Sequence, residues 1–194
     1  MVRWEPGARG RLTQAALDLY AEKGFEQTTV DDIAERAGVT QRTFFRHFAD
    51  KREVLFDGSS ALLDALRRTI AELPDVSSPA AAAEEAFARA AAELDERPEG
   101  FVRRRAAVIA ATPALQEREL LKLTTMTATV RDALVERGVP ALAAELAGEL
   151  GTTAFRVGFA RWAERDGTGS VVPLVRDSFA ALRGLAAGGR EAVR

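Results

Sequence analysis

The sequence predicts an all-α protein of about nine helices. Apolar residues recur every three or four positions along nearly all of its 194 residues, which is the period of an amphipathic helix. No segment alternates convincingly between apolar and polar residues, and no hairpin signal stands out. Prolines such as Pro113 and Pro140 precede apolar runs, at places that fit the first turn of a helix.

Composition narrows the class of protein. The chain has no Cys, which excludes a disulfide framework, a thiolate zinc site and a Cys nucleophile. Its 27 Lys and Arg against 29 Asp and Glu argue against a protein that coats nucleic acid through bulk charge. No stretch approaches the ~18 apolar residues of a membrane-spanning helix, and no secretory signal is visible. We therefore expect a cytoplasmic protein without a membrane partner.

The N-terminal quarter predicts three helices in close succession. An amphipathic first helix ends at Gly24, which is suited to the left-handed closing conformation. Thr29, with an acidic residue three positions later, is a weak form of the capping box and begins a second, short helix. Gly38 ends that helix, and Thr40 caps a third one that runs to about Phe48.

The remainder predicts longer helices. One is expected over residues 51–73, which is followed by a break rich in Pro and Ser. Five more are expected over residues 80–96, 98–111, 113–137, 140–165 and 170–187.

Residues 29–51 contain the most informative pattern. Two short helices joined by a tight turn with Gly38 are what a helix-turn-helix needs, because the turn sets the second helix at a steep angle for entry into a major groove. Between Arg36 and Arg52 there are five Lys and Arg against a single Asp, Asp50. This local charge favours DNA binding, and a merely solvated basic face is the alternative.

Outward positions of the third helix supply the candidate contacts. The paired hydrogen-bonding groups of Gln and Arg match base edges, and Thr, His and Lys side chains can reach phosphate oxygens. We expect base or phosphate contacts from Gln41, Arg42, Thr43, Phe45, Arg46, His47 and Lys51.

The segments GFEQTTVDDIAERAGV and TQRTFFRHFADKREVL, together with the helix before them, resemble the DNA-binding domain of the TetR family of bacterial transcriptional regulators. The resemblance implies a helix-turn-helix domain over residues 1–50 and a helical ligand-binding and dimerisation domain over residues 51–194. It also implies a homodimeric repressor that binds a palindromic DNA operator and is released by a small, largely apolar effector. By position, Thr29 caps the second helix and faces a phosphate, and Lys51 is the phosphate-binding lysine. Phe45 stands where the family often has Tyr, so a hydroxyl contact is lost.

Enzymatic and metal roles are disfavoured. His47 is the only His, and no sequence neighbour offers the partner that a catalytic His needs. One His without Cys also makes a poor metal site, so we expect no enzyme, no metal and no cofactor. The alternatives are a helical small-molecule-binding protein or enzyme without a nucleic-acid role, and a protein–protein adaptor that uses the same helix-turn-helix.

The last two helices are candidates for self-association. Small residues in the helix after Pro140 form a stripe flanked by aromatic residues, and small residues permit close helix packing. We expect the dimer interface at Ala147, Gly151, Ala154, Phe155, Gly158, Trp162, Val175, Phe179 and Leu182. The alternative is that both helices complete the core of the single chain.

Signals for an effector pocket are weaker. An unpaired Arg105 on an apolar helix face would be costly, so either a carboxylate neutralises it or it awaits an anionic ligand. Apolar residues at helical spacing are more often ordinary core than pocket lining. The candidates are Phe56, Phe87, Phe101, Arg105, Ile109, Met126 and Thr127.

Overall fold

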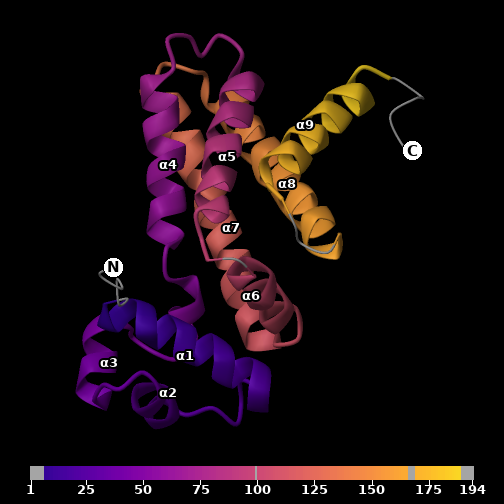
Figure 1. Cartoon of the computed structure of the whole chain (residues 1–194). Helices are drawn as coiled ribbons and strands as arrows, with labels where there is room; N and C mark the ends of the chain where they lie inside the picture. The colour runs from indigo at the N-terminus through magenta and orange to yellow at the C-terminus, as the bar shows by residue number, and fades with distance from the viewer. Residues whose placement is uncertain (1–6, 99, 166–168, 189–194) are drawn as a thin grey trace, which may run out of the picture. The chain divides into compact units, whose positions relative to one another are not determined.

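The computed structural model describes residues 7–98, 100–165 and 169–188, and within these ranges it contains helices and no strand (Figure 1). The all-α prediction is confirmed. The described elements are α1 (Ala8–Lys23), α2 (Val30–Arg36), α3 (Gln41–His47), a 3-10 helix η1 (Glu53–Phe56), α4 (Ser59–Glu72), α5 (Pro79–Asp95), α6 (Phe101–Ala110), α7 (Pro113–Glu136), α8 (Ala141–Glu164) and α9 (Val172–Ala186).

The chain divides into two compact units. Unit 1 contains the residues up to Gly58 together with Arg103–Glu119, and unit 2 contains Ser59–Val102 and the residues from Leu120 onward. Sequence analysis predicts a boundary at residue 50. The structure places η1 in unit 1, because its buried residues Val54, Leu55 and Phe56 extend the apolar contacts of α1.

The prediction of a single helix over residues 51–73 is wrong. The structure has η1, then a break, then α4. Gly58 adopts a positive φ of 91°, a left-handed conformation that ends the first piece before α4 begins. At the start of α6, Gly100 has a φ of 74°, and the helix begins at Phe101 rather than at Pro98.

In unit 1, α2 and α3 pack against α1 (Figure 1). Leu12 and Ala16 of α1, Ile33 of α2 and Phe44 of α3 are completely buried, so one apolar cluster joins the three helices. Burial of a Leu, Ile or Phe side chain stabilises the fold by roughly 1.5–3 kcal/mol. This packing fixes which face of α3 points outward.

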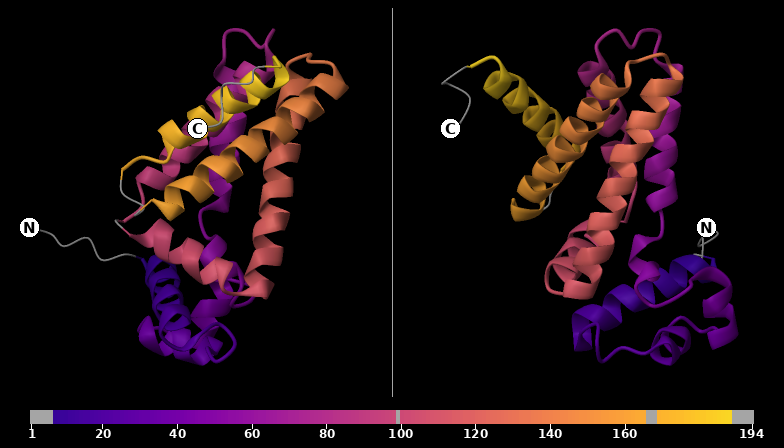
Figure 2. Two further views of the ribbon diagram at one scale, coloured as in Figure 1. Left: turned by 90° about the vertical axis from the view of Figure 1, so that its right-hand side faces the viewer. Right: turned by 180° about the vertical axis from the view of Figure 1, so that it is seen from behind.

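In unit 2, α5 packs against α4, α8 and α9, and α8 lies beside α9 (Figure 2). Phe87 of α5, Met126 of α7 and Phe179 of α9 are buried in its core. None of the described helices combines the length and the apolar character needed to cross a membrane.

The small-residue stripe of α8 lies against the chain's own core. A Cβ on Gly151 would fall 2.3 Å from the Phe87 ring, and one on Gly158 would fall 2.7 Å from the backbone of Val175. Close packing is therefore used within the chain, and the predicted dimer residues are core rather than surface. Eight are buried (Ala147, Gly151, Ala154, Phe155, Gly158, Trp162, Val175 and Phe179), and Leu182 is partly buried against the same cluster.

Candidate nucleic-acid interface

The N-terminus of α2 is closed by a reciprocal capping box. The Asp32 backbone N–H donates to Thr29 Oγ1 at 3.1 Å, and the Thr29 backbone N–H donates to Asp32 Oδ2 at 2.7 Å. A hydrogen bond from Lys23, with others from Thr29, holds the pKa of Asp32 well below its usual range. Because the lowered pKa belongs to the folded state, these contacts contribute above the ordinary Asp pKa of about 3.9 and are lost as the pH falls below it.

Thr29→Ala is expected to lower the free energy of unfolding by about 1 kcal/mol, because it leaves a backbone N–H of the first turn of α2 without its side-chain acceptor. Urea denaturation at neutral pH measures the change. Thr124→Ala is the matched control, since the exposed Thr124 hydroxyl only donates to the Leu120 carbonyl within α7. Equal losses in the two variants would contradict the capping role.

A tight turn joins α2 to α3. Gly38 has a φ of 66°, and its N–H donates to the Glu35 carbonyl at 3.0 Å. Thr40 Oγ1 then accepts from the Thr43 backbone N–H at 3.2 Å and caps α3. The turn needs a residue that tolerates positive φ, so Gly38 sets the angle between the two helices.

Aromatic packing anchors the inner face of α3. The Phe44 ring is fully buried and lies 5.7 Å from the Phe48 ring, centroid to centroid. The opposite face carries the exposed side chains of Gln41, Arg42, Phe45 and Arg46. Phe45 is 53% exposed, so its ring is available for contact with a thymine methyl group.

Three of the five basic side chains between residues 36 and 52 already have partners. Arg36 makes a bidentate pair with Glu22 at 3.1 and 2.9 Å, and Arg52 pairs with Asp50 at 2.7 Å. Lys51 Nζ donates to three backbone carbonyls, of Phe25 at 2.9 Å, Thr28 at 3.0 Å and Glu26 at 3.5 Å, and lies 4.3 Å from the Phe25 ring centroid. Sequence analysis missed these carbonyl contacts.

Arg42 and Arg46 differ from these three. Across the described part of the chain, neither guanidinium has a hydrogen bond or an ion pair with another residue. Both lie on the exposed face of α3 beside Phe45, so the uncommitted positive charge of this segment is concentrated on one short helix. An exposed helix face with unpaired guanidinium groups, each with five donors, fits the acceptor atoms of a major groove.

The side chains that are expected to contact phosphate already have contacts within the chain or are partly enclosed. The Thr29 hydroxyl donates to Asp32 Oδ2 at 2.7 Å, and the Thr43 hydroxyl lies 3.1 Å from the Thr40 hydroxyl. The His47 Nε2 atom is buried and has no hydrogen-bond partner among the described residues. Contacts of Thr29, Thr43, His47 and Lys51 with phosphate stay predictions.

The candidate effector residues are divided between the units. Phe87 and Met126 are completely buried in the core of unit 2, and Thr127 Oγ1 lies 2.7 Å from Thr152 Oγ1. A ligand role for these residues stays a prediction. Unit 1 contains Phe56, Arg105 and Ile109, and unit 2 contains Phe87, Phe101, Met126 and Thr127.

Arg105 has a carboxylate partner. Its Nη2 pairs with Glu119 Oε2 at 2.9 Å, and its Nε donates to the Leu55 carbonyl at 2.5 Å. The guanidinium also lies 4.9 Å from the centroid of the Phe56 ring. Of the two alternatives for Arg105, the structure therefore supports neutralisation by a carboxylate. Elsewhere, no three His, Asp or Glu residues form a potential metal site within the described ranges.

Comparisons with known proteins agree with this geometry. Residues 12–57 match the family described as "Bacterial regulatory proteins, tetR family", and residues 77–187 match the "MftR C-terminal domain". The transcriptional regulator TcmR of Streptomyces glaucescens is 42% identical over 79 residues, which are 41% of this chain and 35% of TcmR. The transcriptional repressor KstR2 of Mycobacterium tuberculosis is 40% identical over 58 residues, 30% of this chain and 29% of KstR2.

A solved structure extends the likeness to the whole fold. The regulator FadR from Bacillus subtilis, in complex with stearoyl-CoA, superposes with a TM-score of 0.60 at 18% identity over 89% of this chain and 96% of FadR. The chain matches only about a third of the length of the two curated relatives. These relatives and the matched family are regulators rather than enzymes.

Proposed function

The chain belongs to the TetR family of bacterial regulatory proteins, and from that premise we propose that it is a transcriptional repressor that binds a palindromic operator as a homodimer. One observation carries the proposal. The outer face of α3 exposes Gln41, Arg42, Phe45 and Arg46, and its two guanidinium groups have no partner within the described residues. In a helix-turn-helix this face enters the major groove.

Each exposed side chain has a distinct task in this proposal. Arg42 donates two hydrogen bonds to the O6 and N7 atoms of a guanine, and Gln41 is suited to an adenine edge. Phe45 packs on a thymine methyl group, and Arg46 pairs with a base or a phosphate. Two copies of α3, one from each subunit, then read half-sites roughly 34 Å apart.

A gel-shift experiment tests the proposal. Duplex DNA from upstream of the protein's own gene is compared with a random duplex of equal length at the same salt concentration, because phosphate contacts alone make affinity strongly salt-dependent. A preference of about 1,000-fold or more for the upstream fragment is the expected result. Equal affinity for both duplexes would contradict sequence-specific regulation and favour a protein that uses this basic face for another purpose.

We further propose that unit 2 binds a small, largely apolar effector that releases the protein from DNA. Its core is mostly aliphatic and aromatic, and FadR, which shares the fold, is described in complex with stearoyl-CoA. An effector that prefers the DNA-free state shifts the population toward it.

Stearoyl-CoA and stearic acid are the first compounds to test for this second role. A ligand that binds only the folded chain raises the midpoint of thermal unfolding, by an amount that follows its concentration relative to its Kd. The effector role predicts that the same compound also dissociates the operator complex. A compound that raises the midpoint but leaves the operator complex intact would contradict effector action.

A further inference from the structure

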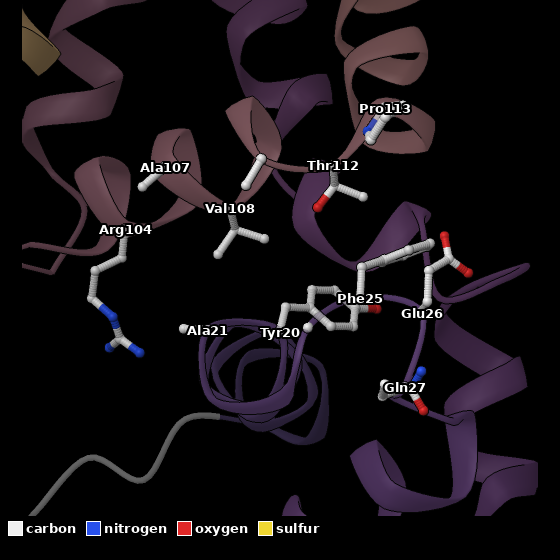
Figure 3. Close-up of a pocket in the computed structure, with 12 residues that line it drawn as sticks. Tyr20, Ala21, Phe25, Glu26, Gln27, Arg104, Ala107, Val108, Thr112 and Pro113 are labelled. Carbon is white, nitrogen blue, oxygen red and sulfur yellow. The ribbon is translucent and has the colours of Figure 1, made fainter.

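Unit 1 contains a cavity that the proposed function does not use. The C-terminal end of α1 and the loop after it form one wall, and α6 with the start of α7 forms the other (Figure 3). Its volume is about 530 Å³, which is within the range of small-molecule sites. None of the residues that line it is among the predicted effector residues.

The walls of the cavity are mostly apolar and partly aromatic. Tyr20 and Phe25 line one side with rings 5.1 Å apart, and Val108 faces them from α6 (Figure 3). The Tyr20 hydroxyl donates to the Lys51 carbonyl, and burial together with the charge of Asp50 raises the pKa of Tyr20. The single hydroxyl proton of Tyr20 is therefore committed to Lys51.

One polar group is directed into this apolar space. Thr112 is 9% exposed, and Figure 3 shows its hydroxyl turned toward the cavity. Thr112 directly precedes α7, and its carbonyl accepts from the Gln116 N–H at 3.0 Å, so the residue occupies the N-cap position, where a Thr hydroxyl commonly accepts from the helix backbone. In the residues that the structure describes, however, nothing is hydrogen-bonded to Thr112 Oγ1. A ligand with a matching polar atom can therefore pair with this hydroxyl and gain about one ordinary hydrogen bond.

The charges at the rim indicate a neutral ligand. Arg104 stands at one end of the cavity, and its Nη2 pairs with Asp18 Oδ1 at 2.5 Å (Figure 3). Glu26 lies on the other side and is exposed to solvent, which screens its charge. No uncompensated cation faces the cavity to receive an anion.

We propose that this cavity is a second binding site, specific for small, neutral aromatic molecules with one hydrogen-bonding oxygen. The aromatic body packs between the Tyr20 and Phe25 rings and Val108. The oxygen pairs with Thr112 Oγ1, which can donate or accept. A ligand in this place contacts both α1 and α6.

Two probes of equal carbon skeleton test the proposal on the full chain. 1-Phenylethanol carries the required oxygen, and ethylbenzene lacks it. Amide shifts in two-dimensional NMR spectra report binding without DNA, so the outcome does not depend on the proposed repressor function. We expect saturable shifts at Gly24, Phe25 and Val108, and about fivefold tighter binding of the alcohol, the equivalent of one ordinary hydrogen bond.

Three variants locate the site. Thr112→Val removes the hydroxyl at nearly constant volume and is expected to bring the alcohol to the affinity of the hydrocarbon. Ala111→Phe fills the cavity from its exposed wall and is expected to abolish the shifts. Ala110→Phe is the control, since Ala110 is also exposed, on α6, but does not line the cavity, and this variant is expected to bind as the parent chain does.

Three results would overturn the proposal. The first is the absence of saturable shifts at the cavity amides. The second is equal binding in the Ala111→Phe variant and in the parent chain. The third is a Thr112→Val variant that still prefers the alcohol over the hydrocarbon. The unperturbed remainder of each NMR spectrum shows that a variant is folded.

Discussion

Arg42→Ala is expected to weaken binding to the preferred operator by about 1–3 kcal/mol, or roughly 5- to 150-fold, while affinity for random duplex changes much less. Arg42 is exposed on the outer face of α3, and no described residue competes for its donors. A guanidinium that reads a guanine edge loses two hydrogen bonds on truncation, whereas the wrong sequence never provided them. Fluorescence anisotropy with both duplexes at one salt concentration measures the ratio.

Arg36→Ala is the matched control for Arg42→Ala. It removes one positive charge from the neighbouring helix α2, but the Arg36 guanidinium is held by Glu22 in an exposed ion pair. Ion pairs of this kind contribute little to stability, so the control protein is expected to fold normally. Its ratio of specific to random affinity is expected to stay close to that of the parent. Equal losses for both variants on the operator would mean that charge alone, and not base recognition, determines binding.

In the proposed homodimer, Leu142→Glu combined with Leu146→Glu is expected to raise the dimer dissociation constant by roughly 100-fold or more and so to produce monomers. These side chains are 69% and 60% exposed, and with the half-exposed Val157 they follow one outward face of α8. The core already uses the inward face of α8, so we propose that this outward face forms the dimer contact. In a symmetric dimer each substitution occurs twice, so four carboxylates enter one interface. Sedimentation velocity measures the change.

Leu120→Glu with Leu121→Glu tests whether the effect is specific to α8. These leucines of α7 are 62% and 58% exposed, which closely matches the pair on α8. They lie outside the proposed interface, so this variant is expected to remain dimeric and to bind the operator normally. A monomeric Leu120→Glu, Leu121→Glu variant together with a dimeric Leu142→Glu, Leu146→Glu variant would contradict the account. The dimer contact would then lie on α7 and not on α8.

Local signals in the sequence predict the helices well. Prolines and capping residues place the starts of α5 and α7 within one residue of the observed positions. The recognition face of α3 is predictable for a different reason. Burial of Phe44 fixes which positions of so short a helix point outward. The break at Gly58 is harder to predict, since the apolar period of the following residues is compatible with one continuous helix.

Partners distant in the sequence are not predictable from spacing. Lys51 contacts carbonyls more than 20 positions earlier, and Glu119 lies 14 positions from Arg105. The small residues of α8 indicate close packing, yet such packing serves a core as well as an interface. Only the contacts of Gly151 and Gly158 with Phe87 and Val175 decide for the core. Similarly, nothing near Thr112 in the sequence indicates that its hydroxyl turns away from the helix end.

Nucleotide-resolution footprinting of the upstream DNA tests the central claim most directly. If the outer face of α3 reads DNA twice through a symmetric dimer, two protected stretches appear in inverted orientation, with centres one helical turn, about 10 base pairs, or a multiple of it apart. The Arg42→Ala variant then loses protection at both stretches together. A single protected stretch, or protection that covers the fragment uniformly and is unchanged by Arg42→Ala, would contradict the account.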